Sequence, residues 1–194
     1  MVIEAILMTH VQADHRSGER ELAERTGATI YAHHSAGLHY PFVPLHDGSE
    51  VSLGNVIVRA LHTPGHTPES MSYLVTDLSR GSEPWMVFTG DTLFVGDVGR
   101  PDLGGADAAG ILFDSLQTQL LALPDYVEVY PAHISGSPCG RSMSGKPSST
   151  IGFERRHNRA LQEPDRARFA TALLVDVPPK PTGFYEIIAR NRGV

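Results

Sequence analysis

The chain has 194 residues, 41% of them hydrophobic, and a formal net charge of −6 at pH 7. This length and composition suit one α/β or α+β domain with a real core and argue against disorder. The acidic balance argues against a protein whose main role is to bind nucleic acid.

The first predicted element is a short buried strand over residues 2–8, VIEAILM. It carries Glu4 and lacks a positively charged start and a long apolar region, so it does not have the pattern of a signal peptide. No apolar run approaches the ~20 residues that a membrane span needs. A single cysteine, Cys139, excludes a disulfide within the chain and favours a reducing compartment. We therefore expect a soluble protein of the cytoplasm.

The rest of the chain mixes strands and helices. Ser17 is an N-cap candidate for a first helix, which Gly27 closes. A Gly54–Asn55 turn joins two strands as a hairpin, and the apolar spacing of residues 107–123 is helical. The predicted strands cover residues 28–32, 50–53, 56–61, 70–76, 85–90 and 127–130. The later helices cover residues 107–123, 150–161, 165–174 and 183–191. No repeat or domain boundary is visible, so residues 1–194 are predicted to form one domain.

Four candidate ligands come directly after predicted strands. His10 follows the first strand, His66 follows strand 56–61, Asp91 follows strand 85–90, and His133 follows strand 127–130. Side chains at strand ends converge on one rim of a sheet, where the packed strands hold them rigid. Histidine and carboxylate together suit zinc, iron or manganese. Two histidines and one carboxylate with open positions form the ligand set of non-haem Fe(II) oxygenases, whereas zinc hydrolases keep three protein ligands and a water.

Several segments, in order, resemble the metallo-β-lactamase superfamily. Its His-x-His-x-Asp-His loop reads here His10, Gln12, Asp14, His15. The segments HTPGHTPES, TGDTLFVGDVGRPDL, YPAHISGSPCGRSMS and STIGFERRHNRAL are most similar to the persulfide dioxygenases, relatives of glyoxalase II that are often fused to rhodanese domains. The resemblance implies a four-layer αβ/βα sandwich and oxidation of a low-molecular-weight persulfide, such as glutathione persulfide, by O2 to sulfite. A rhodanese partner would be encoded with it or elsewhere.

The resemblance also implies roles for individual residues. His10, His66 and Asp91 map to the ligands of one Fe(II) per chain, with Zn as the alternative metal. Asp14, His15 and His133 would either orient these ligands and polarise water or hold a second metal. Arg100 would pair with a carboxylate of glutathione, the alternative being a solvated loop charge, and Cys139 is interpreted as a plain loop thiol.

Two departures from the family pattern matter. Gln12 stands where dinuclear hydrolases have a metal-binding histidine, which weakens a glyoxalase II-like hydrolase interpretation more than the dioxygenase one. The resemblance also implies strands before the loop, whereas only nine residues precede His10 here. We therefore expect an N-terminally incomplete sandwich with an uncovered apolar face that either self-associates, for example as a homodimer, or is unstable. An inactive remnant that acts as a binding domain is the third interpretation.

Overall fold

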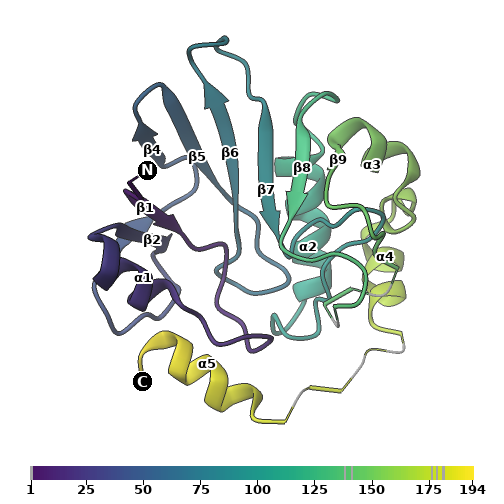
Figure 1. Ribbon diagram of the computed structural model, residues 1–194. Helices are drawn as coiled ribbons and strands as arrows, with labels where there is room; N and C mark the ends of the chain where they lie inside the picture. Colours follow the sequence, from purple (N-terminus) through teal and green to yellow (C-terminus); the bar gives the residue numbers. More distant parts are fainter. Residues whose placement is uncertain (1, 138, 141, 176, 178, 181) are drawn as a thin grey trace.

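The computed structural model describes residues 2–137, 139–140, 142–175, 177, 179–180 and 182–194. It contains two β-sheets that pack face to face and carry helices on their outer sides (Figure 1). The three-stranded sheet is parallel, in the order β1-β2-β3. The six-stranded sheet has the order β4-β5-β6-β7-β8-β9 and is antiparallel except for the β7–β8 pair.

The first sheet is formed by β1 (Ala5–Leu7), β2 (Thr29–His33) and β3 (Val43–Leu45). The second is formed by β4 (Glu50–Leu53), β5 (Val56–His62), β6 (Met71–Asp77), β7 (Met86–Gly90), β8 (Glu128–Pro131) and β9 (Ser149–Thr150). The helices are α1 (Glu19–Thr26), α2 (Ala108–Ser115), α3 (Ile151–His157), α4 (Arg166–Leu173) and α5 (Phe184–Arg192). A π-helical turn η1 (Leu116–Leu120) continues α2, and a short 3₁₀ turn η2 (Ala160–Gln162) follows α3.

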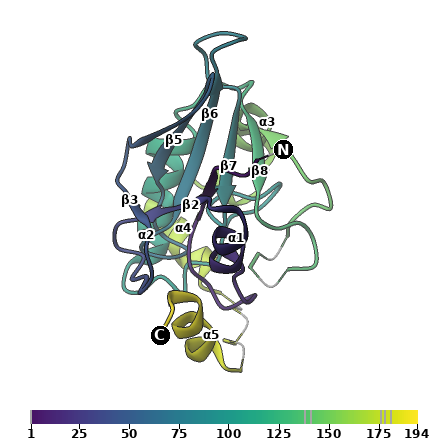
Figure 2. The same ribbon diagram turned by 60° about the vertical axis from the view of Figure 1, so that its left-hand side comes forward.

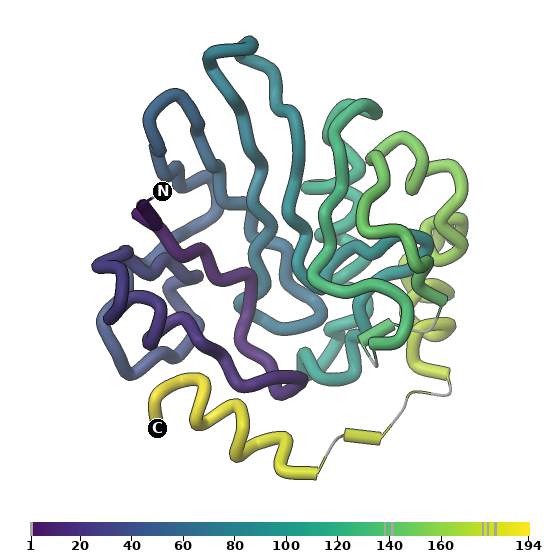
Figure 3. Tube along the Cα trace, viewed as in Figure 1, coloured from purple at the N-terminus to yellow at the C-terminus, as the bar shows by residue number. Residues whose placement is uncertain are grey.

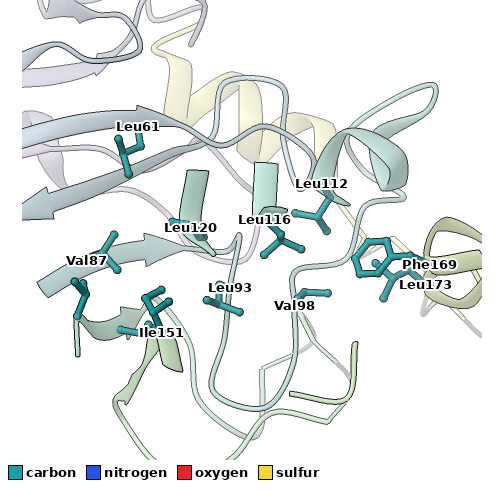
Figure 4. Close-up of a cluster of buried hydrophobic side chains, with 12 residues drawn as sticks. Leu61, Val87, Leu93, Val98, Leu112, Leu116, Leu120, Ile151, Phe169 and Leu173 are labelled. Carbon is teal, nitrogen blue, oxygen red and sulfur yellow. The ribbon is translucent and has the colours of Figure 1, made fainter. Parts of the chain in front are cut away.

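The largest core lies between the six-stranded sheet and helices α2, α3 and α4 (Figure 4). Leu112, Leu116 and Leu120 recur every four residues and are fully buried, so they form the apolar face of this helix. The rings of Phe113 and Phe169, 5.2 Å apart between centroids, join α2 to α4. The predicted helix over residues 107–123 is therefore confirmed, and its second half is wound as a π-helical turn.

A second core joins the two sheets, and a third joins the three-stranded sheet to α1 and α5. In the second core, Leu7 and Tyr31 of the three-stranded sheet pack near Met71 and Tyr73 of β6. The Tyr73 hydroxyl donates a hydrogen bond of 2.6 Å to the Met8 carbonyl. The layers therefore follow the order helix, sheet, sheet, helix, which confirms the four-layer αβ/βα sandwich (Figure 2).

One face of the six-stranded sheet carries an exposed aromatic side chain on β7. On β7, Val87 is fully buried against the helices, whereas its neighbour Phe88 points to the opposite face and is 43% exposed. The Phe88 ring lies beside Tyr130 of β8, with 5.6 Å between the centroids. Self-association through this face stays a prediction. Among the described residues, no helix is both long enough and apolar enough to cross a membrane.

Three local expectations differ from the structure. Strands β3 and β9 were not predicted from the sequence, because three and two residues are too few to show a hydrophobic period. Ser17 is not the N-cap of α1: that position is Gly18, which has no side-chain cap. The helix predicted over residues 150–161 is interrupted because Asn158 has an extended backbone, and its side-chain amide donates instead to the Asp97 carbonyl at 2.9 Å.

Candidate metal centre

The predicted ligands meet at the ends of strands. His10 lies beyond β1, whereas His66, Asp91 and His133 lie beyond β5, β7 and β8 of the other sheet. A backbone hydrogen bond of 2.8 Å from Met71 to the Thr9 carbonyl ties the end of β1 to the six-stranded sheet. The centre is therefore assembled from both sheets.

His10, His66 and Asp91 bring their ligand atoms together. These atoms lie within 4.8 Å of one another. The Asp91 Oδ2 atom is 3.4 Å from His66 Nε2 and 3.8 Å from His10 Nε2. The two imidazole rings are nearly perpendicular, at 81°. The side chains of His66 and Asp91 are inaccessible to solvent, and that of His10 is nearly so.

The hydrogen bonding of this group fits a metal ion. His10 Nε2 and both carboxylate oxygens of Asp91 are buried without a hydrogen-bond partner among the described residues. Buried polar atoms in native proteins are normally paired, since leaving them unpaired costs several kcal/mol. The other nitrogen of His66, Nδ1, donates to the Arg100 carbonyl at 2.9 Å, which leaves the Nε2 lone pair directed inward, as in metal-bound histidines. A divalent cation would satisfy all the unpaired atoms.

The charges of the group are also those of a ligand set. Burial lowers the pKa of His10 from 6.5 to about 4, so this imidazole is neutral at pH 7 and can act as a ligand. For Asp91, burial acts to raise the pKa, but His133, His10 and His66 together lower it below its ordinary value. The ionised carboxylate of Asp91 beside the neutral imidazole of His10 places a negative charge in the group, which attracts a cation.

A second group adjoins the first. The ligand atoms of Asp14, His133 and Cys139 also lie within 4.8 Å of one another. His133 Nε2 is 3.0 Å from Asp14 and 3.4 Å from Asp91. A hydrogen bond to Asp14, together with the neighbouring Asp91 carboxylate and Cys139, raises the pKa of His133 to about 12.

Two residues near the second group, His15 and Cys139, differ from expectation. His15 pairs with Asp14 at 3.1 Å, but its side chain is 66% exposed and it is not among the converging ligand atoms. Cys139, interpreted from the sequence as a plain loop thiol, is buried and belongs to the group. The only sequence signal for it was its position six residues after His133.

Gln12 is buried beside the first group. Its side-chain oxygen accepts a hydrogen bond of 2.8 Å from the Ala13 backbone. Its amide nitrogen therefore faces the centre and lies 3.4 Å from His66 Nε2. An amide nitrogen has no lone pair available for a metal, so Gln12 does not take the place of the missing histidine.

Arg100 forms part of the wall beside His66. Its guanidinium binds Asp102 through two hydrogen bonds, from Nε and Nη2, each of 2.8 Å. Its backbone N–H donates to the Cys139 carbonyl at 3.1 Å, and its own carbonyl accepts from His66. The structure thus shows Arg100 positioning His66 through its backbone, and its pairing with a substrate stays a prediction.

Comparison with known proteins identifies the family. The family model described as the metallo-β-lactamase superfamily matches residues 2–133. The chain belongs to this superfamily of metal-dependent proteins, and its fold agrees with that.

Its relatives carry several functions. A probable metallo-hydrolase of Burkholderia pseudomallei is 35% identical, over 81% of this chain and 60% of that protein. The hydroxyacylglutathione hydrolase of Francisella tularensis subsp. novicida is 35% identical, over 68% of this chain and 49% of its own length.

Two solved structures are similar over nearly the whole chain. A metallo-β-lactamase from Staphylococcus aureus has a TM-score of 0.91 and 35% identity, and ETHE1 from Myxococcus xanthus has a TM-score of 0.83 and 34% identity. Each match covers 99% of this chain, and 59% and 77% of the respective structure. The chain thus spans about 60% of the length of the Burkholderia relative and of the Staphylococcus structure.

Proposed function

We propose that the chain oxidises a low-molecular-weight thiol persulfide, such as glutathione persulfide, with O2 at one Fe(II) per chain. The orientation of Gln12 carries this proposal. Because its oxygen is held by the Ala13 backbone, the first group offers three ligands and no fourth. Two histidines and one carboxylate with open positions are the ligand set of non-haem Fe(II) oxygenases. The likeness to ETHE1 and the sequence resemblance to persulfide dioxygenases support the same activity.

The reaction balances with water as the third reactant. The persulfide RSSH, O2 and H2O give the thiol RSH, sulfite and two protons, so the S–S bond breaks and the outer sulfur is oxidised while O2 is reduced. A ferrous ion held by His10, His66 and Asp91 would supply open positions that bring both reactants together.

The protein's own residues have separate tasks. The Arg100 carbonyl holds His66 in the tautomer whose Nε2 faces the centre. Burial keeps His10 neutral, and Asp91 neutralises half of the charge of a divalent ion. The Arg100 guanidinium would bind a glutathione carboxylate, which would compete there with Asp102. His133 and Asp14 close the side of the site next to Asp91.

A glyoxalase II-like thioester hydrolase is the second candidate. The convergence of Asp14, His133 and Cys139 beside the first group favours it, because dinuclear hydrolases need ligands for a second metal. The similarity to a hydroxyacylglutathione hydrolase points the same way.

Metal content and O2 uptake together test the proposal. We expect one iron per chain, and O2 consumption with sulfite formation when glutathione persulfide is added to the anaerobically loaded protein. The matched variant Asp91→Asn should lose both iron and O2 uptake. Two metals per chain with cleavage of a hydroxyacylglutathione thioester would instead establish the hydrolase. Absence of metal after anaerobic loading would favour the third interpretation, in which the chain is an inactive remnant that acts as a binding domain.

A further inference from the structure

The C-terminal helix α5 packs beside the loop that carries the N-terminal residues of the metal centre. Figures 1 and 3 show this helix, in yellow, running below α1 and the purple N-terminal segment. Its Ile188 packs against the third core, among residues of the three-stranded sheet. The end of the chain is therefore in contact with loop 10–17 near its start.

One side chain of α5 makes the direct connection. Asn191 is only 4% exposed. Its amide nitrogen donates to the carbonyls of Gln12 and His15, at 2.7 and 2.9 Å. Its amide oxygen accepts from the Ser17 backbone N–H at 3.0 Å. Both donors and one acceptor position of the amide are used, and they span six residues of the loop.

These bonds specify asparagine at this position. Two carbonyls face the amide nitrogen, and one N–H faces the amide oxygen, so only one orientation of the amide satisfies all three groups. An aspartate would keep the acceptor, but it would place a carboxylate oxygen against two carbonyls. An apolar residue would fill the space and leave the two carbonyls without this donor.

The helix is itself held in place at its last turn. The His39 N–H donates to the Arg192 carbonyl at 2.7 Å. The Tyr40 hydroxyl, which donates to Glu19 at 2.7 Å, lies 3.3 Å from the Asn191 carbonyl. Arg20 of α1 donates to the Arg190 carbonyl at 3.2 Å. The carbonyls at a helix end need such partners, and here His39 and Arg20 supply two of them from the layer that carries β1. Asn191 therefore has a fixed support.

We infer that Asn191 is a positioning residue of the metal centre. By holding the backbone at positions 12 and 15, it fixes the loop whose side chains Gln12 and Asp14 contact His66 and His133. The inference concerns metal binding and does not depend on which reaction the bound metal supports. Coupling between two sites is reciprocal, so a metal bound at the centre also stabilises the docking of α5.

Substitution at Asn191 measures the coupling in one direction. We expect Asn191→Ala to weaken Zn²⁺ binding, measured by competition with a chelator, about tenfold, as changes to the partners of metal ligands do. Asn191→Asp should be no better than the alanine variant, because it lacks both donors. Phe169→Leu, in the α4 core, serves as the control for general destabilisation and should bind Zn²⁺ like the unmodified chain. Unchanged affinity in folded Asn191→Ala, or an equal loss in the control, would overturn the inference.

Hydrogen exchange of the unmodified chain measures the coupling in the other direction and needs no variant to fold. Zn²⁺ should slow exchange of the α5 amides, residues 184–192, by about the factor that Asn191→Ala loses in affinity. Exchange in α5 that is unaffected by Zn²⁺, while loop 10–17 becomes protected, would refute it. Since neither measurement uses O2 or persulfide, failure here is distinct from failure of the proposed dioxygenase activity.

Discussion

At the residue scale, Asp91 is the ligand whose substitution should weaken metal binding most. Asp91→Asn should lower metal affinity by more than the ~100-fold that changes to the outer partners of ligands reach. The metal-free variant should be less stable than the metal-free parent, because His133, His10 and His66 favour the charged carboxylate over a neutral group in the folded chain. Chelator competition and urea unfolding check the two effects. Retained affinity would place the metal elsewhere.

Gln12 decides how many metals the chain holds. Gln12→His should leave the occupancy of the first group nearly unchanged and admit a second metal, because it adds a lone-pair nitrogen where the Gln12 amide N–H now faces His66. Elemental analysis after anaerobic loading counts the metals, with Gln12→Ala as the control that should keep one. If the parent chain binds no iron and Gln12→His binds one, the native site is damaged and the remnant interpretation is correct.

His33 makes the stability of the fold depend on pH. Its ring stacks on His62 at 4.1 Å and lies 4.3 Å from His34, which in turn stacks on His46. Burial, followed by these three neighbours, lowers the pKa of His33 from 6.5 to about 4. The unfolded chain therefore binds a proton between these pH values and the folded chain does not, so stability is full above pH 6.5 and falls as the pH drops toward 4.

Thermal unfolding measured between pH 7.5 and 4.5 tests this pH dependence. The unfolding midpoint of His33→Asn should fall less steeply with decreasing pH than that of the parent. The difference in slope should correspond to at most one bound proton. His39→Asn, at an exposed position, is the matched control and should follow the parent. Parallel curves for His33→Asn and the parent would show that other groups cause the acid instability.

At the element scale, Gly65 sets the distance between the His66 loop and helix α2. Its φ is +140°, and a Cβ added there would lie 2.6 Å from the Leu112 Cα atom. The added Cβ would meet the backbone of α2, which cannot move aside as a flexible side chain would. Gly65→Ala should therefore destabilise the fold by about 3 kcal/mol, from strain and overpacking together. Metal affinity should fall too, since His66 is the next residue.

Chemical denaturation and chelator competition measure both effects of Gly65→Ala. Gly81→Ala is the matched control, because no atom lies within 4 Å of a Cβ there. The control should change stability by less than about 0.5 kcal/mol. Equal behaviour of the two variants would mean that α2 can shift away from the loop without cost.

At the scale of the whole molecule, a bound metal should act as a cross-link between the sheets. His10 follows β1 of the three-stranded sheet, whereas His66 and Asp91 follow β5 and β7 of the six-stranded one. Because the unfolded chain does not present these ligands together, metal at 100 times its Kd should stabilise the fold by about 2.7 kcal/mol. Unfolding before and after removal of metal by a chelator measures this difference. Asp91→Asn should show no difference, and an unaffected parent chain would exclude a metal that joins the two sheets.

The order of elements and the placement of the candidate ligands could be predicted from the sequence. Strand and helix periods are local, so each long element was found within a few residues of its position. The rule that a polar residue just beyond a buried strand lies on the sheet rim led to His10, His66, Asp91 and His133, because strand packing aligns these ends. The family resemblance then ordered them into one ligand set, and the layers of the fold followed from the same resemblance.

Only the tertiary structure decided which groups touch across the chain. The direction of the Gln12 amide depends on a backbone N–H and on His66, and no pattern of residue types encodes it. Cys139 enters the site through the path of a Gly/Ser-rich loop, which has no period to follow. Asn191 reaches the Gln12 carbonyl from 179 residues away. Such contacts arise when separately predictable elements pack together, since packing fixes hydrogen-bond partners that local sequence leaves open.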